Sequence, residues 1–256
     1  MGSSLSSLAH DVTGAGFPVL LLHSTATDRR MWDPQVPALA RAGYQVVRCD
    51  LRGYGDSPVP DQPHNDADDV LDLLDELGVG RTALVAASGG GWVGVEIAAR
   101  WPERVSALVL LATAMNGHEP SFDLQEFAER EGELLEDGDV AGATELNVDL
   151  WLGPDADDEV RGRLREMQRH AFEVQLAATE QFESIEVPFD PAAITAPTLL
   201  ISGRHDLVDF QEIAVLLAGT IPGARLLELE WAGHLPSMER PDELTQLLVM
   251  FLAGKR

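Results

Sequence analysis

Three side chains that could together activate a nucleophile each follow an apolar segment of the chain. Ser88, Asp206 and His234 stand just beyond runs that are predicted to be buried strands. A serine hydroxyl is a weak nucleophile until a neighbouring imidazole accepts its proton. The imidazole in turn needs a carboxylate on its other ring nitrogen, which fixes the tautomer and stabilises the imidazolium. These residue types therefore predict nucleophilic attack by Ser88 on a carbonyl carbon.

The sequence around Ser88 predicts a sharp turn between a strand and a helix. The apolar run 83–87 ends at Ser88, three glycines follow, and residues 92–100 are predicted to form a helix. Such a turn exposes the serine Oγ above the sheet and needs small residues two before and two after it, which Ala86 and Gly90 supply. An idle serine in a glycine-rich turn is the alternative interpretation. A phosphate-binding loop is disfavoured because no lysine follows the glycines.

Strands alternate with helices over most of the chain, which predicts an α/β fold with a mostly parallel sheet and flanking helices. An edge strand is expected within residues 5–12. The further predicted strands are 18–23, 44–50, 83–87, 105–114, 197–202 and 224–231, and the predicted helices are 31–42, 66–77, 92–100, 210–218 and 241–252. Because the carboxyl ends of parallel strands meet at one edge of a sheet, the three reactive side chains are expected to meet there.

The alternation is interrupted between residues 117 and 187. This segment holds twenty Asp and Glu against five Arg, and helical spacing runs through 122–135, 141–152 and 159–182. We interpret it as a helical lid inserted over the carboxyl end of the sheet, where ligands bind in open α/β folds. The predicted division is a core of residues 1–116 and 188–256 and a lid of residues 117–187.

The composition limits the partners that the protein can have. The net charge of −25 disfavours binding to nucleic acid or to anionic membranes. The single cysteine, Cys49, excludes an internal disulfide and fits a reducing compartment. No apolar run reaches membrane-spanning length, and the amino terminus lacks the pattern of a signal peptide. We expect a cytoplasmic protein, a monomer or a homodimer, that acts on a small molecule.

Several motifs in the expected order resemble those of the α/β-hydrolase superfamily over nearly the whole chain. The order serine, aspartate, histidine is also the order of that superfamily. Within it, the loop His23–Gln35 and the segment Trp151–Pro154 resemble the 3-oxoadipate enol-lactonase branch. The superfamily motifs are the D-x-R-G-x-G-x-S turn at Asp50–Ser57, the G-x-x-D segment at Gly203–Asp206 and the A-G-H-x-P-x-x-E-x-P segment at Ala232–Pro241.

The resemblance implies hydrolysis of a small carboxylic ester or lactone without a metal or an organic cofactor. Ser88 would attack the carbonyl, His234 would act as base, and Asp206 would orient the histidine. The backbone N–H groups of Thr25 and Gly89 would hold the oxyanion. The candidate substrate-binding residues are Ser24, Trp151, Met167, His170, Phe172, Leu207 and Leu235.

The sequence also departs from the family pattern and leaves alternatives open. Ser24 and Ala26 replace glycines of the usual oxyanion loop, and Glu119 is the fallback for the catalytic acid. Other chemistry on the same fold, namely carbon–carbon bond hydrolysis, thioester hydrolysis or cofactor-free perhydrolysis of the haloperoxidase type, is the nearer alternative. A ligand receptor that retains the three residues is the more distant one. A serine at the turn argues against haloalkane dehalogenases and epoxide hydrolases, which use an aspartate there.

Overall fold

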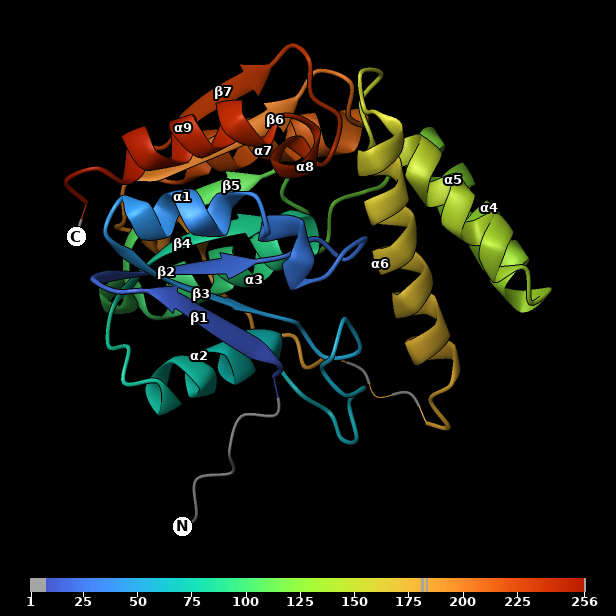
Figure 1. Ribbon diagram of the computed structural model, residues 1–256, viewed down its shortest axis with the longest axis horizontal. Coiled ribbons are helices and arrows are strands. Elements are labelled where there is room, and N and C mark those ends of the chain that lie inside the picture. Colours follow the sequence, from blue (N-terminus) through green and yellow to red (C-terminus); the bar gives the residue numbers. More distant parts are fainter. Residues whose placement is uncertain (1–7, 181, 183, 256) are drawn as a thin grey trace.

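The computed structural model describes residues 8–180, 182 and 184–255, in which one seven-stranded sheet forms the centre of the molecule (Figure 1). The strand order is β1-β3-β2-β4-β5-β6-β7; β1 pairs antiparallel with β3, and every other pairing is parallel. The predicted α/β class with a mostly parallel sheet is therefore confirmed. The strands are β1 His10–Gly14, β2 Phe17–Leu22, β3 Tyr44–Cys49, β4 Thr82–Ala87, β5 Val105–Leu111, β6 Thr198–Gly203 and β7 Arg225–Leu229.

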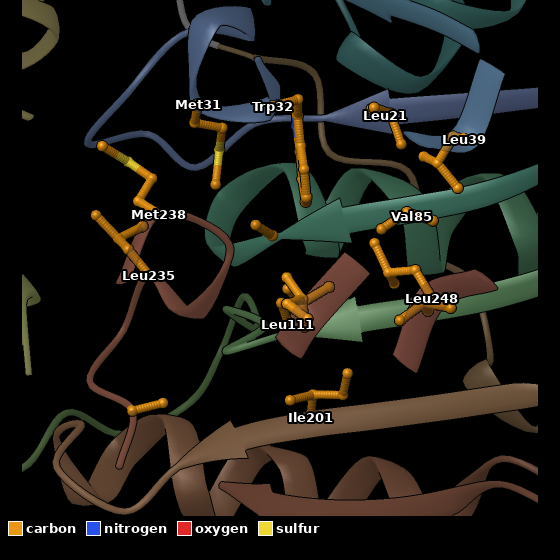
Figure 2. Close-up of a cluster of buried hydrophobic side chains, with 14 of the residues drawn as sticks. Leu21, Met31, Trp32, Leu39, Val85, Leu111, Ile201, Leu235, Met238 and Leu248 are labelled. Carbon is orange, nitrogen blue, oxygen red and sulfur yellow. The ribbon is translucent and has the colours of Figure 1, made fainter. Parts of the chain in front are cut away.

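Helices cover both faces of the sheet because the side chains of each parallel strand alternate between two apolar clusters. Leu21 and Val85 belong to the cluster under α1 (Gln35–Arg41) and α9 (Pro241–Leu252), while Leu20 and Leu84 belong to the cluster under α2 (Asp66–Glu76) and α3 (Ser88–Arg100). Helix α7 (Val208–Thr220) adds its buried side chains mainly to the second cluster. Figure 2 shows the first cluster, in which Leu39 and Leu248 from the helices meet Val85 and Leu111 from the strands. The two clusters hold the sheet, and hence the strand ends, in a fixed position.

Three helices lie between β5 and β6 in the chain and stand beside the sheet, on the side toward which the parallel strands point (Figure 1). They are α4 (Phe122–Glu136), α5 (Val140–Trp151) and α6 (Asp158–Leu176), and we call them the lid helices. Each begins at an Asp or Ser whose side chain accepts a hydrogen bond from a backbone N–H of the first turn. The remaining short elements are the single turns η1 (Arg29–Trp32), η2 (Pro102–Arg104), η3 (Pro191–Ala193) and α8 (Pro236–Glu239).

Some element boundaries differ from the predicted ones, each for a local reason. The expected helix 31–42 is divided into η1 and α1, and Pro34, which lacks a backbone N–H donor, lies at the division. Strand β5 ends at Leu111 rather than at residue 114 because Ala112 adopts a φ of 43°, which breaks the extended conformation. The last lid helix ends at Leu176 and not at residue 182. The edge strand lies at His10–Gly14; of the expected range 5–12, residues 5–7 lie outside the described residues.

Among the described helices, none combines the length and the apolar character needed to cross a lipid bilayer.

Candidate active site

Ser88 is held in a strained turn at the junction of β4 and α3. Its φ of 51° lies in the left-handed region, which costs a residue other than glycine on the order of 1–3 kcal/mol. Gly90 and Gly91, the second and third of the three glycines that follow, allow close packing around it. A Cβ on Gly90 would overlap the backbone oxygen of His23, and one on Gly91 would lie 2.7 Å from the Thr113 hydroxyl. The sequence therefore places small residues where this strand-to-helix turn, the elbow, packs against the ends of neighbouring strands.

His234 and Asp206 form a buried hydrogen-bonded pair at the ends of β7 and β6. The Nδ1 of His234 lies 2.9 Å from Asp206 Oδ2 and 3.1 Å from Oδ1, and the two side chains are 2% and 1% exposed. Because an ionised carboxylate can only accept, Nδ1 carries the proton and Nε2 is left as an acceptor. The backbone N–H of Leu207 also donates to Asp206 Oδ1 over 2.8 Å, which fixes the carboxylate. The fallback acid, Glu119, is exposed and makes no such contact among the described residues.

Aromatic rings and the half-buried carboxylate of Glu239 hold the histidine loop in place. The imidazole of His234 lies between Trp151 of α5 and Phe210 of α7, with ring centroids 4.5 Å and 4.2 Å away. The backbone N–H of His234 donates to the Trp151 carbonyl over 3.0 Å. Glu239 accepts hydrogen bonds from the N–H groups of Gly233, Leu235 and Gly153, and burial raises its pKa. One carboxyl group thus joins the histidine loop to the segment that follows α5.

The loop after β2 places Thr25, one of the two predicted oxyanion donors, next to Gly89, the other. A Cβ on Gly89 would lie 2.5 Å from Thr25 Cγ2, so the two residues are neighbours. Neither of their N–H groups donates to another group within the described residues. Ser24 turns its hydroxyl back to accept the N–H of Ala26 over 3.2 Å, and its carbonyl accepts the N–H of Thr27 over 2.9 Å. These bonds shape the loop at positions where the family usually has glycines.

A buried neutral histidine fixes the start of this loop. The N–H of Leu51 donates to His23 Nε2 over 2.9 Å, so Nε2 is unprotonated, and His23 Nδ1 donates to the Ser24 carbonyl over 2.8 Å. The side chain is fully buried, and this desolvation lowers the pKa of His23. The interaction connects the loops after β2 and β3, on which Thr25 and Tyr54 lie.

Ser88 and His234 open into the same cavity of about 200 Å³. Of the other predicted site residues, Ser24, Thr25, Trp151 and Phe172 line it as well. The residues that sequence reasoning did not single out are Ala26, Tyr54, Phe127, Glu131, Asn147, Gln168 and Gln175. A second cavity of about 760 Å³ borders Thr25, Tyr54 and Gly89 and extends between α3 and residues 184–189.

Four predicted pocket residues lie elsewhere than in the lining of the 200 Å³ cavity. Met167 is buried in the apolar core on the inner side of α6. His170, one turn away, donates a hydrogen bond from Nε2 to the Gly55 carbonyl over 2.9 Å and borders an outer cavity beside Arg29 and Arg30. Leu207 and Leu235 flank the Asp206–His234 pair in the chain but pack into the same apolar core as Met167. Proximity to Asp206 or His234 in the sequence therefore did not decide which side chains face the cavity.

Each lid helix contributes a polar side chain to the cavity from its inward-facing stripe. Glu131 of α4 follows Leu124 and Phe127 at helical spacing, so it lies on the apolar face of the helix. A carboxyl group at such a position was the sequence signal that could have identified Glu131 as a site residue. Asn147 of α5 donates to Glu131 Oε1 over 2.5 Å and accepts the indole N–H of Trp151 over 2.7 Å. Burial raises the pKa of Glu131.

Among the described residues, no group of three or more His, Cys, Asp or Glu side chains is arranged to hold a metal ion. The site combines a histidine–carboxylate pair with a serine that lines the same cavity as the histidine, and the backbone N–H groups of Thr25 and Gly89 lie close to that serine in the fold.

Comparisons with known proteins agree with this architecture. A family model described as the alpha/beta hydrolase family matches residues 19–247. A putative carbamate hydrolase, RutD, from Pseudomonas savastanoi pv. phaseolicola is 30% identical, with 95% of this chain and 96% of the relative covered. The crystal structure of the enol-lactonase from Burkholderia xenovorans has a TM-score of 0.78 at 28% identity, with 96% of each chain covered. A thermophilic esterase from Thermogutta terrifontis has a TM-score of 0.77 at 29% identity, with 96% of this chain and 93% of the esterase covered. The fold, the elbow serine and the matched length together place this chain in the alpha/beta hydrolase family.

Proposed function

We propose that this protein is a serine hydrolase that cleaves a small carboxylic ester or lactone through an acyl-enzyme. The observation that carries the proposal is the buried hydrogen bond between His234 Nδ1 and Asp206, with Ser88 and His234 lining one cavity. This pairing leaves Nε2 of His234 as the free acceptor on the ring. A serine beside such an acceptor can lose its proton as it attacks.

The reaction follows from these groups. Ser88 Oγ attacks the carbonyl carbon while His234 Nε2 takes the hydroxyl proton, and negative charge develops on the carbonyl oxygen. The free N–H groups of Thr25 and Gly89 would bind that oxygen; a donor of this kind contributes on the order of 10²–10³ in rate. The bond to the alkoxide breaks and the alkoxide receives the proton from His234. Water then attacks the acyl-enzyme with the same imidazole as base, which releases the acid and restores Ser88.

The chemistry named for the relatives supports an acyl substrate. Carbamate hydrolase, enol-lactonase and esterase activities all break a bond at a carbonyl carbon. The small volume of the cavity that holds Ser88 favours a short acyl group. The larger cavity beside Thr25 and Gly89 has room for the alcohol part.

The proposal is tested by labelling with a fluorophosphonate, followed by identification of the modified residue. Ser88 should be labelled and Ser24, which lines the same cavity, should not. Ser88→Ala should remove labelling and lower ester turnover on the order of 10⁶-fold, the size of the effect in the best-studied serine hydrolase of this kind. Full ester hydrolysis by purified Ser88→Ala protein would contradict the proposal.

The bond type is tested on the same preparation. Esters and lactones should be hydrolysed faster than thioesters, vinylogous diketones or, with peroxide, the substrates of a perhydrolase. Tight ligand binding by wild-type protein that shows neither turnover nor labelling would instead favour a receptor.

A further inference from the structure

The lid side of the catalytic cavity is unusually polar for a site that receives a small acyl group. Glu131, Asn147, Gln168 and Gln175 all line it, together with the rings of Phe127, Trp151 and Phe172. No Lys or Arg is among the described residues that line this cavity. A carboxylate on the substrate would therefore meet acidic and neutral groups without a cation to pair with.

Glu131 is positioned to accept a hydrogen bond from a ligand. Its Oε1 accepts a hydrogen bond from Asn147 Nδ2. The other hydrogen of Nδ2 is donated to the Ala143 carbonyl over 2.9 Å. Because Asn147 Oδ1 accepts a hydrogen bond from the indole N–H of Trp151, the Asn147 amide cannot rotate to present its oxygen to Glu131. Among the described residues, nothing donates to Oε2 of Glu131. One oxygen is thus fixed by the protein and the other is left for a donor.

Gln168 adds a second group that lacks a partner on the same side. The residue is 4% exposed, and its Oε1 is buried without a hydrogen-bond partner among the described residues. A buried amide oxygen without a donor is costly, and in this orientation the oxygen has almost no surface open to the cavity. Half a turn about the terminal torsion exchanges the oxygen and the NH₂ within the same shape, so Gln168 can offer either group to the cavity.

We propose that the lid wall of the cavity, through Glu131 and Gln168, selects acyl groups that carry a hydrogen-bond donor, cationic or neutral, close to the scissile carbonyl and rejects anionic ones. The inference rests on the proposed function only in taking the bound group to be an acyl group. The preference for a hydrogen-bond donor comes from the side chains of the cavity wall. Burial raises the pKa of Glu131 and the hydrogen bond from Asn147 lowers it, and a bound ammonium would favour the charged carboxylate further.

A matched series of acyl groups of the form X–CH₂–CO tests this preference. Glycyl, glycolyl, propanoyl and malonyl groups differ only in whether X is an ammonium, a hydroxyl, a methyl or a carboxylate. We expect phenyl esters to be cleaved with kcat/KM highest for glycyl and glycolyl, lower for propanoyl and lowest for malonyl. A charge-assisted hydrogen bond predicts a glycyl to propanoyl ratio of about tenfold or more.

Variants identify the residues that produce the ratio. Glu131→Gln should lower the glycyl to propanoyl ratio by about tenfold. The control is Glu129→Gln, which removes the same charge from an exposed position of the same helix and should leave the ratio unchanged. Gln168→Met should lower the glycolyl to propanoyl ratio and provides an independent test on a different helix.

Binding separates this inference from the proposed function. Ser88→Ala protein is titrated with the 4-nitroanilides of glycine and of propanoic acid, which are matched in shape and do not need the nucleophile. Tighter binding of the glycine anilide that is lost on adding Glu131→Gln supports the inference, even if no ester is turned over. Equal binding of the two anilides, or a preference that survives Glu131→Gln, overturns it.

Discussion

The cavity has two walls that differ in how the chain builds them. The strand-end wall consists of Ser24, Thr25, Ala26, Tyr54, Ser88 and His234, which lie in loops or turns directly after strands. The lid wall consists of Phe127, Glu131, Asn147, Trp151, Gln168, Phe172 and Gln175, which lie on α4, α5 and α6. The first wall is fixed by backbone contacts to a buried sheet. The second is fixed by side chains on helices with exposed outer faces.

Because of this difference, the residues that would carry out the reaction are separate from those that would select the substrate. In the strand-end wall, positions are determined by backbone atoms: the His23 carbonyl against Gly90, and the Trp151 carbonyl that accepts the N–H of His234. In the lid wall, Glu131 and Asn147 contact each other through their side chains alone. A substitution in the lid wall can therefore change which substrate fits and leave the nucleophile in place, whereas one in the strand-end wall disturbs both.

The largest expected effect comes from removing the Asp206 carboxylate, which hydrogen-bonds to His234 of the strand-end wall. In Asp206→Asn, the Leu207 N–H keeps the side-chain oxygen, so the NH₂ faces His234 Nδ1 and forces the proton onto Nε2. This tautomer cannot accept the serine proton, and turnover should fall on the order of 10⁴-fold, as in the best-studied triad. The measurement is kcat with a short-chain ester, with the thermal midpoint as evidence of folding.

The control for this variant is Glu119→Gln, which alters an exposed carboxylate that also follows a strand. It should leave turnover unchanged. If Glu119→Gln were the damaging change and Asp206→Asn were active, the acid would be wrongly assigned.

A comparison of two glycines should show that the walls differ in tolerance. Gly90→Ala places a methyl group against the His23 carbonyl and should lower the free energy of unfolding by about 1–3 kcal/mol, with loss of activity. Gly162→Ala on α6 meets nothing within 4 Å and should raise it by about 0.5–1 kcal/mol through helix propensity. Urea unfolding measures both, and equal effects of the two variants would remove the distinction.

The smallest expected effect is a pH dependence of the protein's stability that arises from His23, which precedes Ser24 and Thr25 of the strand-end wall. Burial lowers the pKa of His23 in the folded protein, so the unfolded chain takes up the proton first as the pH falls. The stability contributed by neutral His23 is therefore complete above about pH 6.5, the ordinary pKa of histidine, and is lost progressively below it. In His23→Gln, whose amide oxygen can still accept the Leu51 N–H, the thermal midpoint should fall less between pH 7.5 and 5.5.

His205→Gln, at an exposed histidine, serves as the reference and should follow the wild-type curve. Parallel curves for wild-type and His23→Gln protein would show that His23 does not contribute to the acid sensitivity.

The strand-end wall was largely predictable from the sequence, whereas in the lid wall only Trp151 and Phe172 were predicted. Short apolar runs identified most of the strands, and a motif after each of three runs indicated Ser88, Asp206 and His234. The structure brings Asp206 and His234 into contact and places Ser88 and His234 in the lining of one cavity. In the lid, the sequence predicted three helices, yet Met167 and His170 point away from the cavity and Gln168, between them, lines it.

The sequence by itself determined the order of strands and helices and the turn at Ser88, because these depend on short-range patterns of apolar residues, glycine and proline. It also determined the net acidity and the residue types available for catalysis. Only the tertiary structure decided which of the many lid carboxylates lines the cavity, because the rotation of each helix is set by its packing against the others. The pairing of Glu131 with Asn147 spans two helices, and no local pattern in the chain specifies the contact between them.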